Sequence, residues 1–110
     1  MSGTGGPAVP PDVVARRLGG PDAPVILDVR SGAEFRQGHV PGAVHVPFWR
    51  LAFGVPRVIP AAGPIVVYCG HGPRAYFARA MLSAHGVPDV ACLAGHMAGW
   101  RRAGFPEERA

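Results

Sequence analysis

Cys69 follows an apolar run, residues 64–68, and begins a short glycine-rich stretch that leads into a helical pattern. The stretch reads Cys69-Gly70-His71-Gly72-Pro73-Arg74, with Ala75 next. A strand that ends in a glycine-rich turn and continues into a helix directs backbone N–H groups, and the positive end of the helix dipole, at whatever occupies the turn. In this chain the occupant is the sulfur of Cys69. The pattern therefore predicts a thiol in an anion-binding turn.

The backbone of this turn supplies the predicted hydrogen-bond donors. Gly70 and Gly72 can adopt backbone conformations that other residues avoid, which allows N–H groups to converge. Pro73 has no N–H, and it presets φ for entry into the helix. We therefore expect the substrate-binding donors to be the N–H groups of Gly70, His71, Gly72, Arg74 and Ala75. The His71 side chain is expected to point outward and shape the mouth of the site, and proton transfer by His71 is the alternative.

These surroundings favour Cys69 as a nucleophile. A free cysteine has a pKa near ~8.5, whereas a helix N-terminus and a nearby arginine can bring the pKa into the range of ~3.5 to ~7.5. Cys69 has both influences available, because Arg74 lies close behind it in the same turn. The alternative is a small buried residue at a strand end, a common position for cysteine. The glycines, the arginine and the following helix together favour the catalytic interpretation.

Strand and helix patterns alternate along the chain. Short apolar runs predict strands at residues 25–29, 44–46, 65–68 and 90–93, and a brief edge strand lies within 8–11. Helix signals predict helices at residues 11–19, 31–38, 47–52, 75–86 and 97–103. This alternation indicates an α/β fold with a mainly parallel sheet and helices on both sides. Ligand sites in such sheets lie at the carboxyl ends of the strands, where Cys69 falls.

Length and composition indicate a single domain. A chain of 110 residues with 48% hydrophobic content can form one core and is too short for two. We expect residues 1–7 to be a flexible lead-in, residues 8–106 to form the domain and residues 107–110 to be a tail. The first residues lack a basic start and an apolar stretch, so we expect neither a signal peptide nor a membrane anchor.

Charge and cysteine content narrow the function classes. The 11 basic residues are all arginine, give a net charge of +4 and are scattered along the chain, which argues against nucleic-acid binding. The modest positive charge would still help to attract a small anionic substrate. The two cysteines do not indicate a disulfide framework, so we expect a reducing, cytoplasmic setting.

Two cysteines and two histidines could be taken for metal ligands. The spacings of Cys69, His71, Cys92 and His96 match no common zinc arrangement, so we predict no metal and no cofactor. Cys92 falls in a predicted interior strand, where we expect a packed, inert thiol, and a relay role is the alternative.

Four segments of the chain resemble the single-domain rhodanese-like sulfurtransferases. They span about residues 25–106, and their order and spacing make the joint match specific. The segments are Leu27-Asp28-Val29-Arg30 with Glu34-Phe35, Gly38-His39-Val40-Pro41-Gly42-Ala43, Val67-Tyr68-Cys69 with Gly72 and Arg74, and Leu93-Ala94-Gly95 with Trp100 and Gly104-Phe105-Pro106.

The resemblance implies a three-layer rhodanese-like fold with a five-stranded sheet. It also implies that Cys69 attacks a sulfane sulfur, in thiosulfate or a similar anionic donor, and holds it as a persulfide. The sulfur then passes to a thiol or to cyanide, or to a protein acceptor. Arg74 would orient the incoming anion. A persulfide-carrying or non-catalytic binding module that a protein partner recognises is the alternative from another function class.

Cysteine-dependent phosphatases and arsenate reductases are the main enzymatic alternative. Dual-specificity phosphatases share the rhodanese fold, but their loop has one residue more between cysteine and arginine than this chain, which has four. A shorter turn fits a single sulfur better than a tetrahedral phosphate. Fold similarity alone does not separate the two activities.

Position 96 departs from the family's pattern, because Gly95-His96 stands where a glycine pair is common before the last helix. If the missing glycine provided a positive φ, His96 is strained; if it provided space, the imidazole fills it. We hypothesise that His96 lies near the pocket rim, and a solvated histidine at a helix start is the alternative. For Asp28, Arg30 and Glu34 we expect an ion-pair and capping cluster rather than catalysis.

Overall fold

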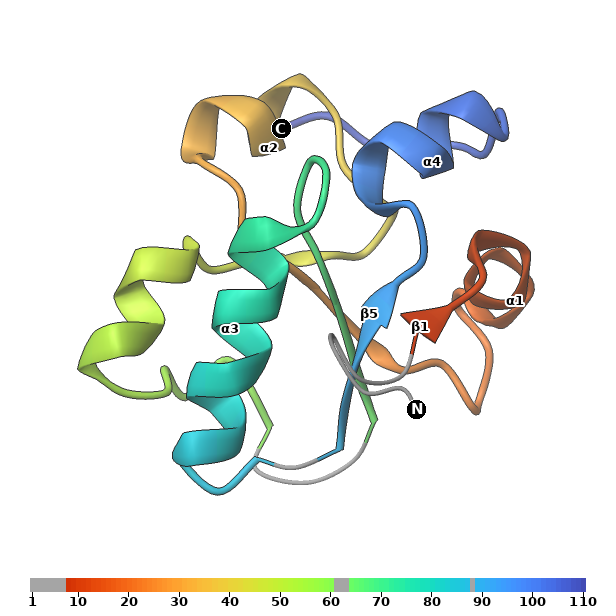
Figure 1. The fold of residues 1–110 in the computed structure, drawn as a ribbon. Helices are drawn as coiled ribbons and strands as arrows, with labels where there is room; N and C mark the ends of the chain where they lie inside the picture. The colour runs from red at the N-terminus through yellow and green to blue at the C-terminus, as the bar shows by residue number, and fades with distance from the viewer. Residues whose placement is uncertain (1–7, 61–63, 88) are drawn as a thin grey trace.

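A five-stranded parallel sheet forms the centre of the computed structural model, which describes residues 8–60, 64–87 and 89–110 (Figure 1). The expected lead-in, residues 1–7, lies outside the described residues. The strands lie in the order β1-β5-β4-β2-β3. Their bounds are Ala8–Val9 (β1), Val25–Asp28 (β2), Val44–His45 (β3), Ile65–Tyr68 (β4) and Val90–Leu93 (β5). The predicted α/β class and five-stranded sheet are confirmed.

The middle strand, β4, is buried along its whole length. It pairs in parallel with β2 on one side and β5 on the other, and both faces of the sheet are covered. This explains the nearly continuous apolar run at 65–68, because a strand that is covered on both faces has no solvated side for polar residues. The register aligns Asp28 with Tyr68, so residues that follow β2 and β4 meet at one edge of the sheet.

The described residues also form four α-helices and one 3-10 helix. Their bounds are Pro11–Arg17 (α1), Gly32–Gln37 (α2), Phe48–Phe53 (η1, the 3-10 helix), Pro73–Ala84 (α3) and His96–Arg102 (α4). Helix α3 begins at Pro73 rather than at the expected Ala75, because a proline at the first helical position loses no hydrogen bond. The capping box predicted at Ser31 and Glu34 is present at the start of α2.

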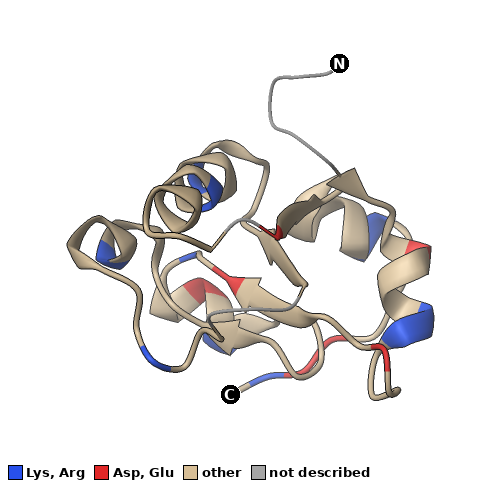
Figure 2. Cartoon of the chain, turned by 90° about the horizontal axis from the view of Figure 1, so that it is seen from below, with Lys and Arg blue, Asp and Glu red and all other residues tan. Residues whose placement is uncertain are grey.

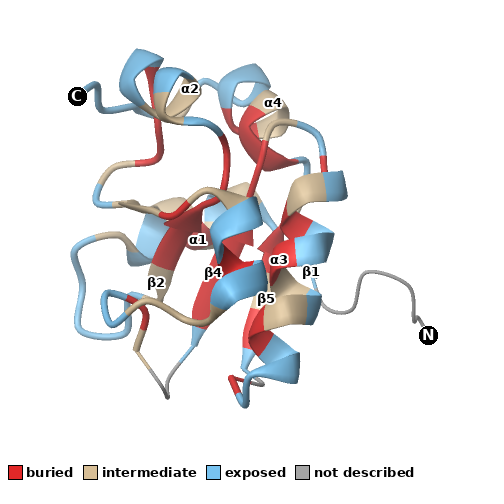
Figure 3. Cartoon of the chain, turned by 90° about the vertical axis from the view of Figure 1, so that its left-hand side faces the viewer, coloured by how far each residue is buried: buried red, intermediate tan, exposed pale blue. Residues whose placement is uncertain are grey.

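Two apolar clusters hold the layers together. Helices α3 and η1 pack on one face, where Ala75, Ala78 and Leu82 contribute to the cluster. Helices α1 and α4 pack on the other, through residues that include Val14 and Trp100. Figure 3 shows the buried segments along the sheet and on the inner sides of the helices. Each large side chain that is fully buried contributes on the order of 1.5–3 kcal/mol to folding.

Charged residues are distributed over separate elements. Figure 2 shows arginines on several helices and loops. None of the helices in the described ranges is long and apolar enough to cross a membrane.

The C-terminal residues pair with the turn after α2. The backbones of His39 and Glu108 exchange two hydrogen bonds of 2.9 and 2.8 Å. The Glu108 carboxylate accepts a bond of 2.8 Å from the Gly42 N–H, and the Ala110 N–H donates to the Arg36 carbonyl. Residues 107–110, expected to form a tail, therefore lie against the turn at 36–42.

A buried ion pair organises the carboxyl edge of the sheet. The Arg30 guanidinium donates to Asp28 Oδ2 over 2.7 Å, and both side chains are buried. The Tyr68 hydroxyl also donates to Asp28 Oδ2 over 2.7 Å and accepts from the Val40 N–H at 3.1 Å. Arg30 donates further to the Gly38 carbonyl over 2.7 Å. The network joins β2, β4 and the turn at 38–40, and it confirms the expected ion pair.

Removing the Tyr68 hydroxyl tests this network. Tyr68→Phe is expected to lower the free energy of unfolding by about 1–3 kcal/mol, because the Val40 N–H and the Asp28 carboxylate each lose a buried partner. Tyr76→Phe is the matched control, since Tyr76 is an exposed tyrosine. Urea denaturation measures both variants. Equal midpoints for the two would show that the hydroxyl contributes nothing to the network.

Candidate active site

The turn between β4 and α3 brings the backbone N–H of Gly72 to the sulfur of Cys69. The Gly72 N–H donates to Cys69 Sγ over 2.9 Å. Gly72 has a φ of 139°, which only glycine adopts readily, and a Cβ here would lie 3.2 Å from Tyr76 Cε2. The position therefore needs glycine for its backbone conformation, and a Cβ would also crowd the Tyr76 ring.

The sulfur of Cys69 is buried and surrounded by donors. Of the five predicted donors, all in the described part of the chain, Gly72 and Ala75 direct their N–H groups at it. Burial raises the pKa of the Cys69 thiol, but hydrogen bonds from the His96 side chain and from these two N–H groups outweigh burial and bring the pKa to about 7. The N-terminus of α3, a helix of 12 residues, also points at the turn.

Helix α4 holds the same turn from the other side. The Met97 N–H donates to the Cys69 carbonyl over 2.9 Å, and the Ala98 N–H donates to the Gly70 carbonyl over 3.2 Å. Figure 1 shows this turn, in green, between α2 and α4. Because the loop carbonyls are bound to the start of α4, N–H groups of the loop are left to face the sulfur.

Arg74 forms an ion pair with Glu34. The two guanidinium nitrogens donate to the two carboxylate oxygens over 2.6 and 3.1 Å. The Arg74 hydrogen bonds, opposed by burial and reinforced by Ser31, lower the pKa of Glu34 to about 2. The pKa of Arg74 is raised, first by Glu34 and further by the nearby Cys69 sulfur. The guanidinium that we expected to orient an anion is thus itself oriented by Glu34.

Glu34 lies at the candidate site through its pair with Arg74, although its sequence position predicted only the capping cluster. The sequence positions could have indicated this pair. Glu34 lies shortly after β2, Arg74 lies shortly after β4, and these two strands are neighbours. Opposite charges just beyond the carboxyl ends of adjacent parallel strands are placed to pair.

His96 is buried against the turn. Its Nδ1 accepts a hydrogen bond of 3.3 Å from the Cys69 N–H, and its ring meets the Tyr76 ring edge-on at 5.7 Å. Its φ is 54°, so the residue has the positive φ that a glycine would supply. The imidazole also occupies the space that a glycine at this position would leave empty. With only 4% of its surface exposed, the alternative of a solvated histidine is wrong.

The other two candidate residues lie apart from the sulfur's donors. His71 is exposed, in line with the expectation that its side chain faces outward. Cys92 is buried on β5 in register with Val67, and burial raises the pKa of its thiol. Within the described ranges, no three His, Cys, Asp or Glu side chains gather as a metal site would require.

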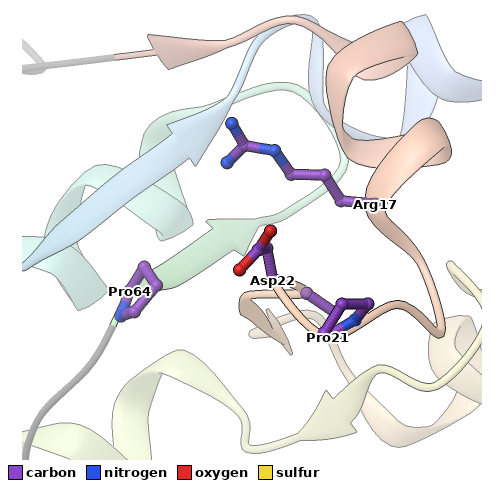
Figure 4. A pocket seen from close by; sticks show the side chains of 5 residues that line it. Arg17, Pro21, Asp22 and Pro64 are labelled. Carbon is purple, nitrogen blue, oxygen red and sulfur yellow. The ribbon is translucent and has the colours of Figure 1, made fainter.

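A separate cavity of about 530 Å³ opens at the other end of the sheet (Figure 4). It is lined by Arg17, Pro21, Asp22, Ala23 and Pro64. Pro64 immediately precedes β4, whereas Cys69 immediately follows it. The cavity therefore lies at the amino end of the strand and is not part of the thiol site.

Known proteins match both the sequence and the fold. The family model for the rhodanese-like domain matches residues 10–103. The chain belongs to the rhodanese-like family. The match includes the Cys69 turn, the Glu34–Arg74 pair and the whole of α4, so these features lie inside the rhodanese-like domain.

Relatives of the rhodanese-like chain carry sulfurtransferase names. A sulfurtransferase from Allochromatium vinosum is 32% identical over 93 residues, covering 84% of this chain and 86% of the relative. The thiosulfate sulfurtransferase GlpE of Pseudomonas putida is 32% identical over 102 residues, covering 93% and 90%. The crystal structure of the Alr3790 protein from Anabaena superposes with a TM-score of 0.82 at 28% identity, covering 93% of this chain and 82% of that one.

Replacing Gly72 tests the geometry of the turn. Gly72→Ala is expected to cost about 1–3 kcal/mol in unfolding free energy, because alanine is strained at this φ. It should also slow alkylation of Cys69 at neutral pH, since the shifted N–H no longer supports the thiolate. Gly19→Ala is the control, with a φ of 74° and open space around the new methyl group. Equal Cys69 alkylation rates in the two variants would contradict a role for the Gly72 N–H.

Proposed function

We propose that this rhodanese-like protein transfers a sulfane sulfur from thiosulfate, or a similar small anionic donor, to cyanide or a thiol through a persulfide on Cys69. The observation that carries the proposal is the set of donors around the sulfur: the N–H groups of Gly72 and Ala75 and the side chain of His96. They hold the pKa of Cys69 at about 7, so roughly half of the molecules carry the thiolate at neutral pH.

The proposed first step forms one sulfur–sulfur bond and breaks another. The Cys69 thiolate attacks the outer sulfur of thiosulfate, and sulfite leaves with the electron pair of the broken bond. The product is the Cys69 persulfide anion, whose charge lies on the outer sulfur. The N–H groups and the start of α3 are positioned to stabilise this anion.

The proposed second step returns the enzyme to its starting state. Cyanide, or the thiolate of an acceptor, attacks the outer sulfur of the persulfide. The bond to Cys69 Sγ breaks, and the electron pair returns to that sulfur. Thiocyanate or a new persulfide leaves, and no oxidant or reductant is consumed. A partner protein that presents a cysteine could serve as the acceptor by the same chemistry.

The Glu34–Arg74 pair supports recognition of an anionic donor. Arg74 is fixed by two hydrogen bonds to Glu34 and lies close enough to interact with the Cys69 sulfur. In the proposed reaction it orients the sulfonate part of the donor with donor groups that Glu34 leaves free. The name of the Pseudomonas relative, a thiosulfate sulfurtransferase, supports the same class of donor.

The two unpaired cysteines support a reducing compartment. Cys69 has to be a free thiol at the start of each cycle, and neither Cys69 nor Cys92 is in a disulfide. We therefore place the proposed activity in the cytoplasm.

Turnover assays on two cysteine variants test the proposed function. Cys69→Ser is expected to abolish thiocyanate formation from thiosulfate and cyanide, because a serine hydroxyl is not ionised at neutral pH. Cys92→Ser, which alters the packed thiol on the neighbouring strand, should retain activity. An aryl phosphate is offered in parallel, and we expect no phosphate release. Phosphate release without thiocyanate formation would replace sulfur transfer with the phosphatase alternative.

A further inference from the structure

His96 occupies a position that the backbone makes unfavourable. Among the described residues it is the one non-glycine residue with a positive φ, at 54°. Such a conformation costs roughly 1–2 kcal/mol for a residue with a Cβ, and it persists where the surroundings hold it. The His96 side chain, with 4% of its surface exposed, makes contacts that a glycine could not make.

The imidazole is fixed on two sides. The Cys69 N–H donates to Nδ1 over 3.3 Å, and the Tyr76 ring stands at 87° to the imidazole plane with the ring centres 5.7 Å apart. The Nε2 atom faces Gly72, because a Cβ added to Gly72 would lie 3.5 Å from it. Gly72 is also the residue whose N–H donates to the Cys69 sulfur, so Nε2 borders the residue that binds the sulfur.

These contacts also determine the tautomer. A ring nitrogen that accepts a hydrogen bond carries no proton, so the neutral His96 ring must carry its proton on Nε2. We propose that His96 donates a hydrogen bond from Nε2 to the Cys69 thiolate, and that this side chain acts together with the backbone donors to stabilise the charged sulfur. This proposal depends on the proposed function in one respect: both require Cys69 to be the nucleophile.

The groups that face the sulfur come from every element packed around it. Arg74 contributes a positive charge from α3, Gly72 and Ala75 contribute N–H groups, and the buried thiol of Cys92 lies on the neighbouring strand, β5. Burial is the largest influence on the pKa of Cys69 and raises it; among the groups that lower it, His96 has the largest effect. The pH dependence of Cys69 reactivity should therefore respond to position 96.

Alkylation of Cys69 by iodoacetamide tests this proposal without requiring sulfur transfer. The rate is measured against pH, and peptide mass spectrometry locates the adduct. The wild-type rate should rise through an inflection near pH 7 and then level off, because only the thiolate reacts and the pKa is about 7. His96→Gly should move the inflection upward by about one unit, which makes alkylation about fivefold slower at pH 7.

Two further variants separate the roles of the two ring nitrogens. His96→Asn tolerates a positive φ and can still accept from the Cys69 N–H, but it has no donor at the Nε2 position, so its inflection should also rise. His96→Gln places an amide N–H near the Nε2 position and should restore part of the wild-type profile. His85→Asn, an exposed residue at the end of α3, is the control and should match the wild type.

Two results would overturn the proposal. One is that His96→Gly inflects at the same pH as the wild type. The other is that His96→Asn inflects at the wild-type pH while His96→Gln inflects at a higher pH. Urea denaturation confirms that each variant is folded. Failure of the proposed function gives a different pattern: the inflections shift as described, but thiosulfate leaves no persulfide on Cys69 of the wild type.

Discussion

A negative charge on the Cys69 sulfur has to be stabilised away from bulk water, because the residue is completely buried. Burial alone would keep the thiol protonated, since desolvation disfavours the charged form. The surrounding elements supply the hydrogen-bond donors that stabilise this charge. Strand β4 ends at the sulfur, Gly72 turns its N–H inward at 2.9 Å, and α3 begins immediately afterward. Without these donors the Cys69 thiol would stay protonated, which is the direction in which burial shifts the pKa of Cys92.

Two ion pairs of different character stand at the carboxyl edge of the sheet. Asp28 and Arg30 are both buried and fully engaged, with Tyr68 bound to the same carboxylate, so removing one member would leave a buried charge unpaired. Glu34 and Arg74 are partly exposed and lie beside the sulfur. The first pair therefore fixes the scaffold, whereas the second sets the direction of a guanidinium at the site. Helix α4 completes the arrangement by binding the carbonyls of Cys69 and Gly70.

The features that could be predicted are those encoded in short segments. The run at 65–68 indicates a doubly covered strand, Ser31 and Glu34 indicate a capping box, and Gly72 indicates a turn with an unusual backbone. The features that escaped prediction depend on contacts between distant segments. Glu34 and Arg74 are 40 positions apart and meet only because β2 and β4 are neighbours. The burial of His96 likewise depends on the packing of α4 against the Cys69 turn.

The proposed activity requires that Cys69 carry a transferable sulfur. Intact-protein mass spectrometry after incubation with thiosulfate, in the absence of reducing agents, tests it most directly. We expect a gain of one sulfur atom, ~32 Da, that cyanide removes and that Cys69→Ser prevents. An unchanged mass, or a gain that persists in Cys69→Ser, would contradict it.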